Sequence, residues 1–95
     1  MTAAERNAAI RLILDEKCLP LLCAKGHDYS GDEDALKNLR RHGLKGIVVR
    51  LGDKYERLDS LVWNDREAQV SEKVEDTLVD MVNYALLALV MMGEK

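Results

Sequence analysis

Two segments of this 95-residue chain decide its fold: VRLGDKYERL at 49–58 and SEKVEDTLVDMVNYALL at 71–87. The first carries a basic row and the second an acidic row, each with members three or four residues apart. The basic row is Arg50, Lys54 and Arg57, and the acidic row is Glu72, Asp76 and Asp80, which the neutral Asn83 continues. This spacing places each row on one face of a helix. We expect two helices that pack antiparallel, with the charged rows beside their seam.

These two rows allow more than one interpretation. The arginines of the basic row can bind phosphates through bidentate hydrogen bonds. Carboxylates four residues apart on one helix can instead hold Mg²⁺, as they do in all-α nucleotide hydrolases. A third interpretation is structural, because charges buried at a seam need partners and each acid has a base available. The residues taken alone favour this last interpretation, a ladder of salt bridges.

The length of the chain predicts a single domain, residues 1–95, and the absence of Phe predicts an aliphatic core. A net charge of -3 argues against binding to duplex DNA, which usually requires a strongly basic domain. Residues 37–50 nevertheless contain five Lys or Arg and no acid. They are Lys37, Arg40, Arg41, Lys45 and Arg50. A local anion site is therefore compatible with an acidic chain.

Cysteine usage and hydropathy bear on the compartment. Cys18 and Cys23, five residues apart on an expected helix, point in different directions and would not form a disulfide easily. Unpaired cysteines fit a reducing cytoplasm. The N-terminal sequence MTAAERNAAIR has no apolar run beside basic residues and so predicts no secretion signal. The apolar run Tyr84–Met92 is too short for a bilayer, which needs about 20 residues. We expect a cytoplasmic protein with no membrane contact.

Caps and hydrophobic periodicity predict four helices and no strand. The first begins at Thr2, which forms a capping box with Glu5. Pro20 lies inside it and should kink it, because proline lacks an N–H and clashes with the preceding turn. Gly26 should end this helix after Lys25, as glycine does at many helix ends.

The remaining three helices follow from similar signals. A capping box of Ser30 and Glu33 begins a short second helix that ends at Gly43. The third runs from about Ile47 to Trp63, and the fourth from its cap Ser71 to about Met92. The expected apolar stripe of the third helix is Val48, Leu51, Tyr55, Leu58 and Val62. The predicted fold is all-α, with a kinked N-terminal helix, a short second helix and two long antiparallel helices.

The fourth helix becomes apolar on all sides at residues 85–92, ALLALVMM. A helix with no polar face must be buried on every side. One chain of this length has too little material to surround it, and large exposed apolar patches usually mark contacts with other proteins. We therefore expect a compact homo-oligomer.

The loop GHDYSG at 26–31 offers a second candidate binding feature. Tyr29 belongs to no apolar stripe, so its ring is the best candidate to stack on a base. Lys25 lies just before the loop and could bind a phosphate. His27 fits a hydrogen-bonding role better than a catalytic one, since no pattern places a nucleophile near it.

The pieces KGHDYS, DALKNLRR, VRLGDKYERL and EDTLVDMVNYALL, in this order from Lys25 to Leu89, resemble one family. It is the nucleotide-modification-associated domain family of small, mostly phage, all-α proteins, which is remotely similar to the MazG-type nucleotide pyrophosphohydrolases. Small stand-alone phage proteins of this kind include the anti-CBASS sponges, which resemble this chain in length and helix pattern. The resemblance to sponges implies a homohexamer that sequesters cyclic oligonucleotide second messengers without cleaving them.

The chain departs from the MazG-type enzymes in its third helix. Those enzymes carry an E-x-x-E pair, where this chain has Asp53 and Glu56 interleaved with the basic row. The basic side chains would compete with Mg²⁺ for these carboxylates, so the sequence favours binding over hydrolysis.

The resemblance therefore implies a protein of phage immune evasion that binds a cyclic di- or trinucleotide, and we expect it to need no cofactor. The predicted ligand-binding residues are Lys25, His27, Tyr29, Arg40, Arg41, Arg50, Lys54, Arg57 and Asn83. The first alternative is a Mg²⁺-dependent pyrophosphohydrolase, whose metal ligands would be Asp53, Glu72, Asp76 and Asp80. The second alternative is a structural helical oligomer without a ligand.

Overall fold

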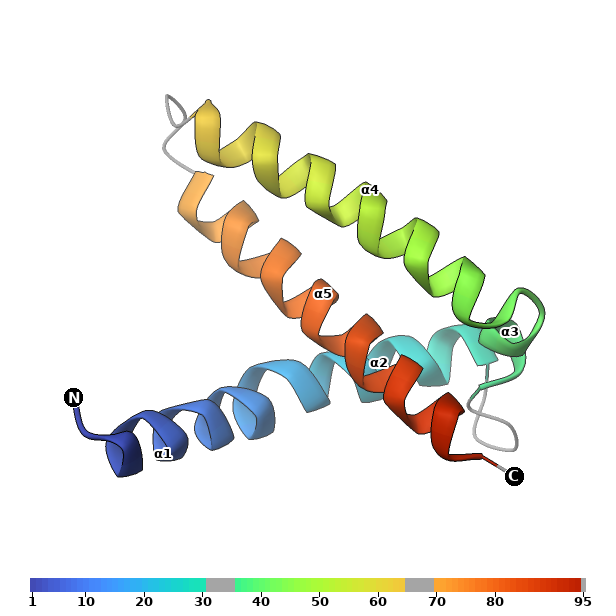
Figure 1. Ribbon diagram of the computed structural model, residues 1–95, viewed down its shortest axis with the longest axis horizontal. Helices are drawn as coiled ribbons and strands as arrows, with labels where there is room; N and C mark the ends of the chain where they lie inside the picture. Colours follow the sequence, from blue (N-terminus) through green and yellow to red (C-terminus); the bar gives the residue numbers. More distant parts are fainter. Residues whose placement is uncertain (31–35, 65–69, 95) are drawn as a thin grey trace. The chain divides into compact units, whose positions relative to one another are not determined.

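The structure, a computed structural model, describes the backbone of residues 1–30, 36–64 and 70–94, with the side chains of all these residues except 26–30, 70 and 71. Within these ranges every element is a helix, which confirms the all-α prediction (Figure 1). The chain divides into two compact parts, Met1–Ala35 and Leu36–Lys95, and each is described by itself.

The N-terminal part is one continuous helical rod. It consists of α1 (Ala3–Ile13), the π-helical turn η1 (Leu14–Cys18) and α2 (Leu19–Ser30), drawn from blue to cyan in Figure 1. The predicted capping box is confirmed at its start. Thr2 Oγ1 accepts a hydrogen bond from the Glu5 backbone N–H at 3.1 Å, and Glu5 Oε1 accepts one from the Thr2 N–H at 3.3 Å.

Before Pro20, where the sequence predicts a kink, the helix contains a widened turn. The backbone N–H of Leu19 bonds to the carbonyl of Leu14, five residues back, as in a π-helix. The extra residue in this turn lies directly before the proline, where a regular α-helix would press the ring against the carbonyl of Glu16. The π-turn therefore allows the helix to continue past a residue that would otherwise break it.

The prediction that Gly26 ends the first helix is wrong, because α2 continues to Ser30. Glycine permits the left-handed backbone that ends a helix but does not require it, and inside a helix it costs only about 1 kcal/mol. His27 and Tyr29 therefore lie on a helix and not in a loop. Of the predicted capping box of Ser30 and Glu33, the glutamate lies outside the described residues.

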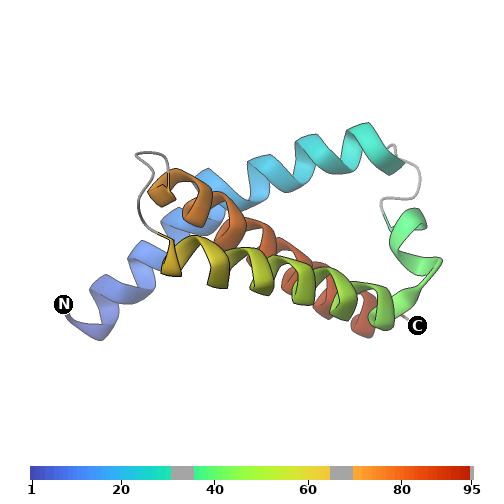
Figure 2. The same cartoon turned by 90° about the horizontal axis from the view of Figure 1, so that it is seen from above.

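The C-terminal part contains α3 (Lys37–Arg40), α4 (Gly43–Trp63) and α5 (Val70–Gly93). The two long helices lie side by side and antiparallel, as the sequence predicts (Figures 1 and 2). Ile47 on α4 and Thr77 on α5 are almost fully buried. The Thr77 hydroxyl donates to the backbone carbonyl of Lys73 at 2.8 Å, so this buried polar group is satisfied within its own helix.

The start of α4 differs from the prediction. Gly43 has a positive φ of 62° and is the first residue of α4, so α4 begins before the predicted start at Ile47. The left-handed backbone of Gly43 turns the chain directly from α3 into α4. Likewise α5 begins at Val70, so Ser71 lies inside the helix and is not its cap.

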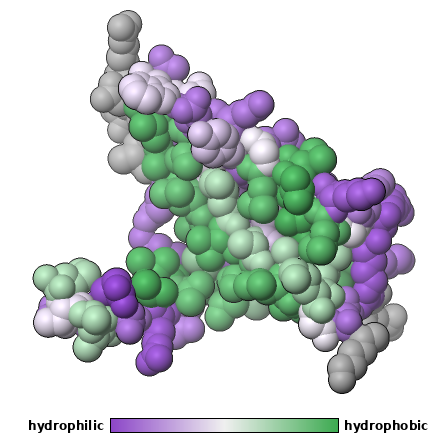
Figure 3. Space-filling view, in the orientation of Figure 1, coloured by the Kyte–Doolittle hydropathy of each residue, from purple (hydrophilic) through white to green (hydrophobic). Residues whose placement is uncertain are grey.

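Three of the five residues in the predicted apolar stripe of α4 are exposed. Val48, Tyr55 and Val62 are exposed, while Leu51 and Leu58 are partly buried. On the face shown in Figure 3, hydrophobic residues gather along α5, where Leu89 is among the exposed ones. By length and composition alone, the 22-residue segment Glu72–Gly93 would be sufficient to cross a membrane. A core helix of a soluble protein passes the same test.

Candidate functional site

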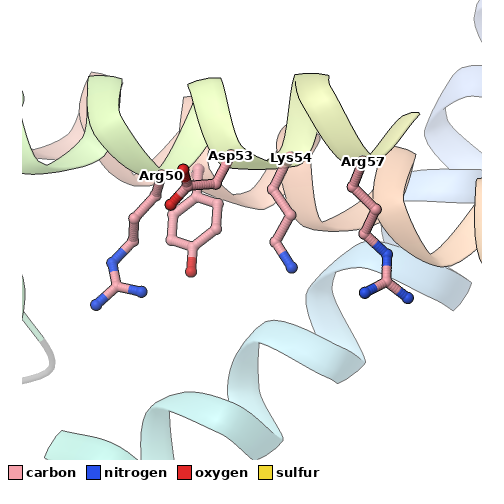
Figure 4. Close-up of a pocket in the computed structure, with 5 residues that line it drawn as sticks. Arg50, Asp53, Lys54 and Arg57 are labelled. Carbon is pink, nitrogen blue, oxygen red and sulfur yellow. The ribbon is translucent and has the colours of Figure 1, made fainter. Parts of the chain in front are cut away.

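The basic row lies on one side of α4, as its spacing predicts. Figure 4 shows Arg50, Lys54 and Arg57 extending from the helix in the same direction, with the lysine between the two arginines. The row occupies the middle of a long helix that is held by its packing against α5. Its three cations therefore start from fixed backbone positions.

Lys54 is the member of the row that pairs across the seam. Its Nζ lies 3.0 Å from Oδ2 of Asp80 on α5, and the two side chains are 28% and 15% exposed. An ion pair this sheltered from water is screened less than a surface pair. The ion pair holds the lysine ammonium against α5, so this ammonium is less available to bind a ligand.

The two arginines differ from the lysine between them. Arg50 and Arg57 are both exposed, and neither forms an ion pair with any residue in the described ranges. Glu72 and Asp76 are exposed and, within the same ranges, have no ion pair either. The residues alone favour a ladder of salt bridges, but among the described residues the two rows form one ion pair, between Lys54 and Asp80. The register of the helices brings no other member of the basic row within reach of an acid in these ranges.

An open depression of about 330 Å³ lies over the basic row. It is lined by Arg50, Asp53, Lys54, Arg57 and Tyr84. Tyr84 comes from α5 and supplies the aromatic ring of the site. Tyr84 is not among the predicted ligand-binding residues, although it continues the i+4 series of Glu72, Asp76 and Asp80. The depression thus combines two guanidinium groups with one aromatic side chain.

The other predicted ligand-binding residues of the C-terminal part lie elsewhere. Asn83 is only 6% exposed and does not line the depression. Arg40 bonds to the carboxylate of Glu94, which joins α3 to the end of α5. Arg41 is exposed in the turn between α3 and α4. The structure brings together the predicted residues of α4 but not these three.

Three predicted ligand-binding residues belong to α2 in the N-terminal part of the chain. Lys25 is exposed near the end of α2. The side chains of His27 and Tyr29 lie outside what the structure describes. Their predicted roles as ligand contacts stay predictions.

The four carboxylates of the hydrolase alternative do not fit a metal site within one protomer. In the part of the chain that the structure describes, no three His, Cys, Asp or Glu side chains come together as metal ligands. Asp80 is engaged by Lys54, and Asp53 shares the depression with three cations. Mg²⁺ prefers several oxygen ligands in near-octahedral geometry, and a neighbouring ammonium opposes it electrostatically.

Comparison with known proteins identifies the family. The model of a family described as Nucleotide modification associated domain 1 matches residues 25–92, which include α4, all of α5 except its last residue, and every residue that lines the depression. No curated protein and no solved structure matches the chain. The chain therefore belongs to the Nucleotide modification associated domain 1 family.

Proposed function

We propose that this protein binds cyclic oligonucleotide second messengers and sequesters them without cleaving them. One observation carries the proposal: Arg50 and Arg57 project from the same side of α4 into one depression, and neither has an acidic partner in the described ranges. Exposed guanidinium groups without carboxylate partners are available to phosphates, which they bind bidentately. The resemblance of the chain to phage anti-CBASS sponges supports the cyclic nature of the ligand.

The arrangement suits a ligand with more than one phosphate. Arg50 and Arg57 are seven residues apart, or roughly 10 Å along the helix axis. Each would bind a separate phosphodiester, while Tyr84 offers its ring to a base. Lys54 lies between them but is paired with Asp80, so its ammonium is less available to the ligand than the two guanidinium groups.

Sequestration requires that the bound ligand is not hydrolysed. Hydrolysis in the MazG-type enzymes depends on carboxylates that hold Mg²⁺, and the carboxylates within residues 1–30, 36–64 and 70–94 do not assemble into such a set. This geometry favours binding over the hydrolase alternative. We further propose that the protein acts in the cytoplasm of an infected host cell, as a homo-oligomer whose resemblance to the sponges suggests a hexamer.

The first experiment separates binding from hydrolysis. The protein is incubated with a panel of cyclic di- and trinucleotides and Mg²⁺, separated from free ligand and denatured by heat. Recovery of intact nucleotide supports the proposal. Release of cleaved nucleotide would overturn it in favour of the hydrolase, and retention of no nucleotide would leave the structural alternative.

The second experiment tests the site. Arg50→Ala and Arg57→Ala should each weaken binding of the retained nucleotide by about 10- to 100-fold, since each removes a charge-assisted contact worth about 1.5–3 kcal/mol. Arg11→Ala, at an exposed arginine of α1, is the matched control and should bind like the unmodified protein. Equal affinity in all three variants would move the site away from the depression.

A further inference from the structure

The middle of α4 carries an exposed glycine surrounded by exposed apolar side chains. Among the residues that the structure describes, a Cβ added to Gly52 would meet no atom within 4 Å beyond its chain neighbours and the backbone of its own helix. Val48, Val49 and Tyr55 lie around it on the helix surface and are 65%, 63% and 61% exposed. Glycine in an exposed helix interior lowers helix stability, and nothing in the described protomer requires it here. A glycine at this position would allow another polypeptide to pack closely against the exposed face of α4.

The charges along this line of the helix are arranged symmetrically about Gly52. Lys45 lies seven residues before it and Asp59 seven residues after it, so the three form one stripe along α4. Both charged side chains are exposed. One oxygen of Asp59 accepts a hydrogen bond from Trp63 Nε1 at 2.9 Å, which holds the carboxylate while its other oxygen can accept a further bond. Along α4, the stripe therefore consists of a basic residue, a glycine and an acidic residue, in that order.

We propose that a second copy of this chain docks on this face, with the two α4 helices antiparallel and crossing at Gly52. A two-fold axis at the glycine places Lys45 of each copy opposite Asp59 of the other, which forms two ion pairs. A parallel pair would bring lysine against lysine and aspartate against aspartate. Two glycines at the crossing allow the helices to approach closely, and Val48 and Tyr55 of both copies then lose their exposure to water.

This interface does not involve the candidate ligand site. Arg50 and Arg57 lie two and five residues from Gly52, which places them on the far side of the helix. Pairing through Gly52 would leave the depression of each copy open. The proposed interface can therefore be tested independently of ligand binding.

Disulfide trapping tests the crossing point. In a background of Cys18→Ala and Cys23→Ser, Gly52→Cys should form a covalent dimer under mild oxidation, visible on a denaturing gel. Ser60→Cys is the control: in the antiparallel pair its two copies lie about 24 Å apart along the axis, beyond the roughly 7 Å that a disulfide spans. A dimer with Ser60→Cys of equal yield, or none with Gly52→Cys, would overturn the proposal.

Charge exchange tests the orientation with the same readout. In the Gly52→Cys background, Lys45→Asp or Asp59→Lys alone should slow disulfide formation by about tenfold, because each places like charges opposite one another. The double exchange should restore the rate. Circular dichroism checks that each variant is helical. Failure of the double exchange to restore the rate in folded protein would refute the antiparallel pairing.

Discussion

Replacing Asp80 with alanine tests whether the seam of the helical hairpin depends on its ion pair. The Nζ of Lys54 and Oδ2 of Asp80 are 3.0 Å apart, and the lysine is 28% exposed. After Asp80→Ala, the lysine would keep its charge in a partly buried position without its acid. The unpaired ammonium must either be hydrated, which requires the seam to open locally, or remain poorly solvated. Both outcomes reduce the stability of the folded protein.

The magnitude follows from the burial of the pair. Exposed ion pairs contribute about 0.2–1 kcal/mol, and removing one partner of a fully buried pair costs about 3–5 kcal/mol. This pair is more sheltered than a surface pair and less so than a buried one. We expect Asp80→Ala to lower the free energy of unfolding by about 2 kcal/mol, and Tm by roughly 8–16 °C for a domain of this size.

Asp76→Ala is the matched control, since the same substitution lies one turn earlier on α5. Asp76 is exposed and forms no ion pair within the described part of the chain, so its loss should change stability by less than about 0.5 kcal/mol. Urea unfolding followed by circular dichroism, at one protein concentration and without Mg²⁺, measures both variants. Equal stability of the two variants would refute this account of the seam.

Three further substitutions test other parts of the fold by urea unfolding. Thr2→Ala should cost about 1 kcal/mol because it removes the cap that begins α1, whereas Thr2→Ser should cost little. Gly46→Ala should destabilise by about 1 kcal/mol, since its Cβ would lie 2.7 Å from Cβ of His42 and the strain exceeds the gain in helix propensity. Glu94→Gln should change stability by less than about 0.5 kcal/mol, because its ion pair with Arg40 joins side chains that are 39% and 45% exposed.

Local signals in the sequence predicted the helices and most of their properties. The capping box of Thr2 and Glu5 and the two long helices depend on interactions within a few residues. Glycines were less informative, because a residue that tolerates every backbone conformation identifies none of them. The sequence predicts a helix end at Gly26, which lies inside α2, and another at Gly43, which has a left-handed backbone and begins α4.

The candidate site shows the limit of the sequence more clearly. Helical spacing alone determined that Arg50, Lys54 and Arg57 share one side of α4, because that depends only on the period of the helix. Only the tertiary structure decided that the lysine is paired with Asp80 while the arginines are not, and that Tyr84 joins them. Those outcomes depend on the register and rotation of α5 against α4, which are set by packing between residues distant in the chain. The periodic pattern determines which residues share one face of a helix, whereas the packing of two helices determines which residues of the neighbouring helix they contact.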